Sequence, residues 1–228
     1  MLQTLKNECD RLGVRLDEAQ LDALRRYGEA LLEKNRVMNL TAITDPREVA
    51  RLHFADCLAL TTLFDFSGKT AVDVGCGAGF PGVPLQIAVP SMKLTLLDSL
   101  QKRMTWLGET MRSLGLPSEV VCCRAEEFDR RERYDVAVSR AVARLNVLCE
   151  LCLPLVRVGG SFLAMKASAA EEELDEARRA VAVLGGRVRT VASYELGDLT
   201  RRVVIIDKLR PTPAAYPRRF AKIKQKPL

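Results

Sequence analysis

The stretch that decides the fold is Asp73-Val74-Gly75-Cys76-Gly77-Ala78-Gly79-Phe80-Pro81-Gly82. It follows an apolar strand pattern at about 70–75 and leads into a helical pattern at about 82–89. Glycines at every second position allow positive φ angles and let a ligand approach the backbone closely. A glycine-rich turn between a buried strand and a helix is typical of α/β folds that bind nucleotide-like ligands.

The segments after this loop alternate between strand and helix patterns. Such alternation predicts a doubly wound, mostly parallel sheet, which is a Rossmann-like α/β fold. Two further strand patterns have no helical pattern between them, so we expect an antiparallel hairpin at one edge of the sheet. The expected strands lie near 70–75, 93–98, 119–123, 134–139, 160–166, 187–195 and 202–208, and the expected helices near 82–89, 100–114, 143–153 and 169–184.

The residues before the sheet show only helical patterns. Asp17 and Gln20 form a capping-box pattern at the start of a helix over 17–36, and Asp45-Pro46 is a start signal for a second helix to about residue 63. Near the other end, four prolines predict an extended arm rather than regular structure. We therefore divide the chain into a helical cap (1–66), a cofactor-binding domain (67–209) and a basic arm (210–228).

Composition indicates an ordinary globular protein of the cytoplasm. Of its 228 residues 48% are hydrophobic and 28% charged, with no apolar run of membrane-spanning length and no signal-peptide pattern at the start. Seven cysteines suit reduced thiols, and the Cys149/Cys152 pair lies in an apolar helical pattern, where buried thiols are expected rather than a metal site. A single histidine, His53, argues against a Ser/His/Asp hydrolase. Nothing in the sequence indicates more than a monomer.

The positive charge is concentrated at the end of the chain. The formal net charge is +6, and residues 208–228 carry seven basic residues and no acidic one, so the rest sums to −1. A concentrated basic segment indicates binding to phosphate, either of nucleic acid or of a membrane surface.

The acidic residues around the glycine loop distinguish between two cofactors. Gly77 to Gly82 also matches the dinucleotide fingerprint, but Asp73 would repel a pyrophosphate, and Phe80-Pro81 adds bulk where a dinucleotide needs close approach. A sulfonium and an ammonium group, by contrast, attract a carboxylate, so we expect S-adenosylmethionine. Asp98 ends the next strand, where a carboxylate accepts ribose hydroxyls, and Glu126 follows the third strand, on the adenine side. The expected cofactor contacts are Asp73, Gly75, Gly77, Gly79, Asp98 and Glu126.

Several stretches, in order and spacing, resemble the bacterial small-subunit rRNA guanine-N7 methyltransferases, the RsmG or GidB family. The resemblance extends from about residue 35 to the end. It implies methylation of N7 of one guanosine, position 527 in the 530 loop of 16S rRNA, with cofactor contacts at Gly75, Phe80, Ala125, Glu126 and Arg140. The stretches are Asn39-Leu40-Thr41-Ala42-Ile43, 73–85, Leu96-Leu97-Asp98-Ser99-Leu100-Gln101-Lys102-Arg103, Arg124-Ala125-Glu126-Glu127, Ser139-Arg140-Ala141-Val142-Ala143 and Tyr216-Pro217-Arg218-Arg219.

Guanine N7 already has a free lone pair, so the transfer needs no general base and depends on alignment. A donor to O6 would orient the base, and the candidates are Arg140 and Lys166, which end the fourth and fifth strands. His53 and Asp56 match the family's His-x-x-Asp pattern. Two roles remain possible for this pair, a hydrogen bond in helix packing and a contact with RNA. The predicted partner is 16S rRNA or the small subunit, with RNA phosphates bound by Arg218, Arg219, Lys222, Lys224 and Lys226.

Other functions remain open at this point. A methyltransferase of the same fold could act on a protein or another RNA, and a basic tail would suit an acidic protein. A nucleic-acid-binding protein with a vestigial cofactor site is a further alternative, as is an NAD enzyme, against which Asp73 and Phe80-Pro81 argue.

Overall fold

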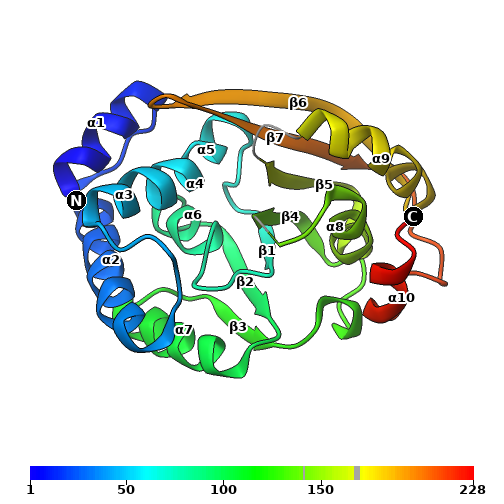
Figure 1. Ribbon diagram of the computed structural model, residues 1–228, viewed down its shortest axis with the longest axis horizontal. Helices are drawn as coiled ribbons and strands as arrows, with labels where there is room; N and C mark the ends of the chain where they lie inside the picture. Colours follow the sequence, from blue (N-terminus) through cyan, green and yellow to red (C-terminus); the bar gives the residue numbers. More distant parts are fainter. Residues whose placement is uncertain (141, 167–169) are drawn as a thin grey trace.

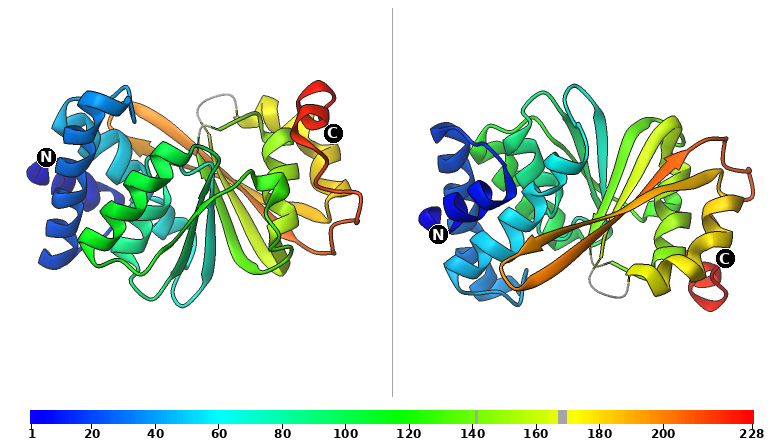
Figure 2. Two further views of the ribbon diagram at one scale, coloured as in Figure 1. Left: turned by 90° about the horizontal axis from the view of Figure 1, so that it is seen from below. Right: turned by 90° about the horizontal axis from the view of Figure 1, so that it is seen from above.

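The computed structural model describes residues 1–140, 142–166 and 170–228. Within them a seven-stranded sheet has the strand order β3-β2-β1-β4-β5-β7-β6. Helices cover both of its faces, so the molecule has three layers (Figures 1 and 2). The strands are β1 (Thr70–Val74), β2 (Lys93–Asp98), β3 (Glu119–Cys122), β4 (Tyr134–Arg140), β5 (Val156–Lys166), β6 (Gly186–Leu196) and β7 (Leu199–Lys208).

The first five strands are parallel, and the last two form the predicted antiparallel hairpin. β1 pairs with β2 on one side and with β4 on the other, while β7 pairs antiparallel with both β5 and β6. The predicted fold class is therefore confirmed. The chain reverses its direction of winding at β1, and in open α/β sheets ligands bind at the carboxyl ends of the strands at such a switch point. The glycine loop follows β1 directly.

The strands bury alternate side chains on opposite faces, as their period of two requires. Ala71 of β1 belongs to one hydrophobic core, whereas Val72 and Val74 belong to the other. The first core is covered by α6 (Gly82–Ala88), α7 (Gln101–Leu114) and the N-terminal helices, and the second by α8 (Leu145–Cys152), α9 (Ala170–Val183) and α10 (Phe220–Gln225) (Figure 2). Residue 169, where we expected the helix now seen as α9 to begin, lies outside the described residues, as does Ala141.

The N-terminal third is helical, with two features that the sequence analysis did not predict. α1 (Leu2–Leu12) precedes the predicted helix, and the second predicted helix contains a π-helical stretch, Val49–Ala55. The capping box of Asp17 and Gln20 is formed and starts α2 (Glu18–Met38). Around the π-helix lie the short helices α3 (Pro46–Glu48), α4 (Asp56–Leu58) and α5 (Leu60–Leu63). No helix in the described ranges has both the length and the apolarity to cross a membrane.

The N-terminal helices share their hydrophobic core with the sheet. Tyr27 and Phe54 stack with ring centroids 5.7 Å apart, and both side chains are fully buried. The Tyr27 hydroxyl donates a hydrogen bond to the Ala78 carbonyl, within the glycine loop. The N-terminal helices therefore pack against the glycine loop and support it. Domain boundaries at 66/67 and 209/210 remain predictions.

The prediction of an extended C-terminal arm was wrong for residues 220–225. These form α10, which packs through the fully buried Ile223 against the second core. The prolines lie before and after this segment, at 211, 213, 217 and 227, so none of them interrupts its hydrogen bonds.

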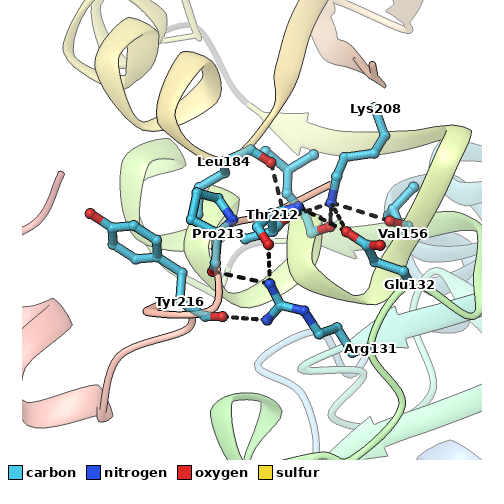
Figure 3. Close-up of polar contacts among 9 residues, drawn as sticks. Arg131, Glu132, Val156, Leu184, Lys208, Thr212, Pro213 and Tyr216 are labelled. Carbon is cyan, nitrogen blue, oxygen red and sulfur yellow. Dashed lines mark hydrogen bonds and ion pairs between the residues drawn. The ribbon is translucent and has the colours of Figure 1, made fainter. Parts of the chain in front are cut away.

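The chain leading to α10 is held against the body by polar contacts (Figure 3). The Arg131 guanidinium donates to the carbonyl oxygens of Thr212, Pro213 and Tyr216. The ammonium group of Lys208 is buried; it donates to the Leu153 carbonyl and the Thr212 hydroxyl, each at 2.6 Å. Burial lowers the pKa of Lys208 to about 8.

The pKa of Lys208 predicts a pH dependence of stability. The folded-state pKa lies below the ordinary 10.5, so the unfolded chain binds a proton that the folded protein lacks between about pH 8 and pH 10.5. Across this window the free energy of unfolding of the wild type should therefore rise relative to that of Lys208→Met, by no more than about 3 kcal/mol. Urea unfolding at several pH values measures the difference, and parallel curves for the two proteins would contradict the prediction.

Candidate cofactor and acceptor site

The glycine loop leaves the carboxyl end of β1 and is held by the neighbouring strand. The Gly75 amide donates to the Leu97 carbonyl at 2.8 Å, and the Gly77 amide donates to Asp98 Oδ2 at 3.0 Å. Gly77 has a φ of +57°, and no atom lies within 4 Å of where its Cβ would stand. This position therefore exposes backbone to open space, where a ligand can approach closely.

A cavity of about 310 Å³ lies over the loop. Its walls come from five separate segments of the chain, and its size is at the lower end of small-molecule sites. The lining residues are Leu40, Thr41, His53, Gly75, Cys76, Gly77, Ala78, Phe80, Asp98, Arg103, Arg140 and Val142.

Five of the predicted cofactor contacts meet in this cavity, namely Gly75, Gly77, Phe80, Asp98 and Arg140. Gly79 lies beneath it, because a Cβ there would meet Val83 at 2.6 Å and Leu107 at 3.0 Å in the core.

Asp73 also lies beneath the cavity wall. It is fully buried, and its Oδ2 accepts a hydrogen bond from the Gly82 amide at 2.7 Å. Its Oδ1 has no hydrogen-bond partner among the described residues. Burial raises the pKa of Asp73 to about 7. A buried carboxylate with an unpaired oxygen beneath the loop suits a cationic ligand above it, although Asp73 does not line the cavity itself.

Ala125 and Glu126 lie apart from this cavity. They belong to a short 3₁₀ helix after β3, and Glu126 forms an ion pair with Arg124 at 3.6 Å. Glu126 lines a separate cleft of about 660 Å³, together with Arg219 and Phe220 of the C-terminal arm. The structure therefore brings the adenine-side residues next to the basic arm, which their sequence positions did not indicate.

Phe80 contacts two groups from other elements. The His53 ring stacks on it with centroids 4.4 Å apart, and the Arg140 guanidinium lies 4.9 Å from its centroid. Cations are attracted to the faces of aromatic rings. The Phe80 end of the loop is thereby joined to the π-helix and to the end of β4.

Arg140 is the centre of a network of side chains. Its Nη1 donates to the Leu52 carbonyl at 3.2 Å and to Asp56 Oδ2 at 3.3 Å, and its Nη2 lies 3.0 Å from His53 Nδ1. Asp56 is buried and also accepts from the Tyr194 hydroxyl at 2.9 Å. Of the two roles left open for His53 and Asp56, the structure shows the packing hydrogen bonds.

A second cavity of about 620 Å³ adjoins the first and shares His53, Arg140 and Val142 with it. Lys166 lies on its wall, as do Arg144 and Arg201. Lys166 Nζ donates to the Ala143 carbonyl at 2.6 Å and pairs with Glu173 at 2.7 Å. Both predicted base-orienting residues therefore line this cavity, and each already has partners within the protein.

Of the five predicted phosphate-binding residues, Arg218 has a different environment from the others. It forms a bidentate ion pair with Glu150, which is fully buried, through Nε at 2.7 Å and Nη2 at 2.5 Å. This pair holds the arm to α8. The remaining four are exposed, namely Arg219, Lys222, Lys224 and Lys226.

Four residues that line the two cavities were not predicted from the sequence, namely Thr41, Arg103, Tyr194 and Arg201. Thr41 lies in one of the quoted family stretches, and Arg103 in another, which is the signal that could have indicated them. Tyr194 and Arg201 lie on the β6–β7 hairpin, and no local pattern connects them with residues 53–56. Cys149 and Cys152 are buried free thiols, as predicted. Within the described ranges there is no group of three or more His, Cys, Asp or Glu residues that could hold a metal ion.

The sequence matches a family model described as GidB, rRNA small subunit methyltransferase G, over residues 20–204. The chain belongs to this family. Proteins called ribosomal RNA small subunit methyltransferase G are similar to it along nearly their whole length. The one from an Exiguobacterium species is 47% identical over 224 residues, covering 95% of this chain and 94% of the relative. The one from Bacillus cytotoxicus is 47% identical over 216 residues, covering 91% and 90%.

Two solved structures with the same fold are methyltransferases of low sequence identity to this chain. A geranyl diphosphate methyltransferase bound to sinefungin has a TM-score of 0.59 at 16% identity, and the match covers 85% of this chain and all of that one. A methyltransferase from Aquifex aeolicus has a TM-score of 0.57 at 18% identity, covering 74% and 96%. The predicted family is thus confirmed, and so is the cofactor, S-adenosylmethionine.

The environment of His53 predicts that its ring stays neutral. Burial, and then the Arg140 charge, lower the pKa of His53 from 6.5 to about 3. The unfolded chain therefore binds a proton that the folded protein lacks, so this group reduces stability as the pH falls from 6.5 toward 3. His53 is the only histidine, so its ring resonances can be followed by NMR without assignment. They should not shift between pH 8 and about pH 5.

The same protein unfolded in urea is the control, and there the ring should titrate near 6.5. A midpoint near that value in the folded protein would show that the ring is not buried beside Arg140 as the structure has it.

Proposed function

We propose that this protein transfers a methyl group from S-adenosylmethionine to N7 of a guanosine in the 530 loop of 16S rRNA. The family supports rRNA as the acceptor, because the relatives are named for methylation of the small-subunit RNA. The observation that carries the proposal is that Arg140 lines both adjoining cavities. One cavity holds the cofactor and the other receives the base. The substrate implies a cytoplasmic enzyme, and we propose that it acts as a monomer.

The second cavity has the chemistry that a guanine base requires. A base must leave its stack to reach an enclosed site, and it is then held by contacts to its edge and face. Val142 is 42% exposed and lines both cavities, so it offers an apolar surface for the face of the base. Arg144 and Arg201 supply positive charge on the wall, which suits the phosphates on either side of the base.

Arg140 has donors left for the base. A guanidinium has five N–H groups. Nη1 uses two, on Leu52 and Asp56, and Nη2 uses one, on His53, so one N–H of Nη2 and that of Nε remain. We propose that Arg140 donates to guanine O6, which leaves N7 free to attack. Lys166 is the second candidate for this contact, with its ammonium position fixed by Glu173 and Ala143.

The chemistry needs no residue that removes a proton. S-adenosylmethionine, when bound, supplies a methyl group on a sulfonium, and N7 has a lone pair at neutral pH. The protein's residues therefore act by orienting the base and by excluding water, a mode that contributes about 7–11 kcal/mol to a two-reactant step. Burial, and then the Arg140 charge, keep His53 neutral, and it takes no part as a base in this scheme.

The function is tested by mapping the methyl group. Small subunits, and 16S rRNA stripped of protein, are taken from cells that lack the enzyme and incubated with labelled S-adenosylmethionine. We expect label on N7 of one guanosine in the 530 loop. Label on a protein, on another RNA or on a different base atom would overturn the proposed acceptor and leave the methyltransferase assignment intact.

Arg140→Lys should reduce kcat/KM for methyl transfer by at least about 100-fold, because lysine keeps the positive charge but cannot reach Asp56, His53 and the base together. The control is Arg157→Lys, which changes an exposed ion pair with Asp135 and should leave the activity unchanged. Wild-type turnover in Arg140→Lys would show that the guanidinium of Arg140 is not needed to orient the base.

Replacing Lys222, Lys224 and Lys226 together by Gln should weaken binding to 16S rRNA and reduce the slope of log affinity against log salt by about 2. These side chains are exposed, and the change leaves the Arg218–Glu150 pair in place. A matched control removes the same charge elsewhere, by changing the exposed residues Lys6, Arg15 and Lys93 to Gln. Equal salt slopes for the two triple variants would show that the arm does not bind RNA phosphates.

A further inference from the structure

We propose that the Thr41 hydroxyl donates a hydrogen bond to the carboxylate of bound S-adenosylmethionine, and that Arg140 and His53 fix its direction. The chain of contacts runs from the Arg140 guanidinium through the His53 ring to Thr41. The inference rests only on the cofactor part of the proposed function, so it holds whatever the methyl acceptor is.

The first contact fixes one nitrogen of the His53 ring. Arg140 Nη2 lies 3.0 Å from His53 Nδ1. A guanidinium donates hydrogen bonds and cannot accept them. Nδ1 must therefore be the acceptor, which means that it carries no hydrogen.

The second contact follows from the first. A neutral imidazole has one N–H, so with Nδ1 bare the hydrogen is on Nε2. Nε2 lies 2.8 Å from the Thr41 Oγ1 atom. His53 therefore donates to Thr41, and the hydroxyl oxygen uses one lone pair to accept. The low pKa of His53 agrees with a neutral ring.

The other lone pair of the Thr41 hydroxyl is also used. The Ile43 amide donates to Oγ1 at 3.0 Å. A hydroxyl has two lone pairs and one hydrogen, so both accepting positions are filled and only the hydrogen is left. Across residues 1–140, 142–166 and 170–228 no acceptor for that hydrogen is found. Thr41 is thus restricted to donating.

The backbone of Thr41 is held equally firmly. The Asn35 side chain donates to the Thr41 carbonyl and accepts from the Thr41 amide, both at 2.9 Å. Asn35 is 9% exposed and lies in the last turn of α2. In this proposal the hydroxyl donates into the cavity over the glycine loop, which Thr41 lines.

The carboxylate is the group of the cofactor that matches a position restricted to donating. Asp98, the predicted partner of the ribose hydroxyls, contacts the loop at Gly77. Thr41 instead reaches the loop at Phe80, through the stacked ring of His53, and this end we assign to the amino-acid part. There the ammonium group offers only donors, whereas the carboxylate offers only acceptors.

The test compares two ligands and two variants by isothermal titration calorimetry on the full chain. Thr41→Val keeps the shape of the side chain and removes the hydroxyl, whereas Thr41→Ser keeps the hydroxyl. We expect Thr41→Val to weaken S-adenosylmethionine binding about 10- to 100-fold, as for a hydrogen bond to a charged group. Decarboxylated S-adenosylmethionine should bind wild type and Thr41→Val equally well, which also shows that the variant is folded. Thr41→Ser should bind both ligands like the wild type.

Unchanged affinity of Thr41→Val for S-adenosylmethionine would overturn the inference, and so would an equal loss for both ligands, because the acceptor would then not be the carboxylate. A second measurement needs no variant. The ¹⁵N shifts of the single histidine should show a hydrogen on Nε2 and none on Nδ1 at neutral pH. The opposite tautomer would overturn the proposed hydrogen-bond directions from Arg140 through His53 to Thr41. Neither measurement uses RNA, so a wrong acceptor assignment would leave both results unaffected.

Discussion

The arrangement of the site depends on one guanidinium at the end of a central strand. Arg140 is the last residue of β4, beside the switch point of the sheet. Its side chain contacts the helical segment that includes His53 and Asp56, and it also contacts Phe80 of the glycine loop. Asp56 compensates its buried charge and at the same time accepts from Tyr194 of the edge hairpin. A buried ion pair of this kind is costly to form, and removing one partner is costly as well. The network therefore fixes how the helical layer, the central strand and the hairpin sit around the two cavities.

The helical layer at the N-terminus contributes to the site as well as to the core. Its helix α2 places Tyr27 beneath Ala78 of the glycine loop and Asn35 beside Thr41, and the π-helix places His53 on Phe80. A π-helical stretch shifts the register of the side chains that follow it, and such stretches are frequent at functional sites. Here the stretch includes both Leu52 and His53, which contact Arg140. The cofactor loop is thus enclosed by residues that lie before the sheet in the sequence.

The basic arm is bound to the body of the protein by one ion pair, and its other basic side chains are exposed. Lys208, at the end of β7 just before the arm, and Arg218 within it use their charges inside the protein, on Glu132 and Glu150, while the lysines of α10 face solvent. The attachment also places α10 beside the 3₁₀ helix at Ala125–Glu127. The exposed charges of the arm are therefore held at one side of the molecule, next to the loop that we predicted to lie on the adenine side. A solvated tail would not hold them in any particular place.

The sequence by itself determined the alternation of strands and helices, the glycine loop after β1, the edge hairpin, the family and the cofactor. The strands, helices and hairpin follow from periodicity and from residues that are neighbours in the chain, and the physics that produces them is local. The family follows instead from the resemblance of several short stretches, and the cofactor from the charge and bulk of residues around the glycine loop. Only the tertiary structure decided that Asp73 lies beneath the cavity, that Arg218 is bound to Glu150 and that residues 220–225 form a helix. It also decided the network around Arg140, because Arg140 meets His53 and Asp56, and Asp56 meets Tyr194, only when separate elements pack together. Contacts across such distances depend on the shape of the whole core, which no window of the sequence contains.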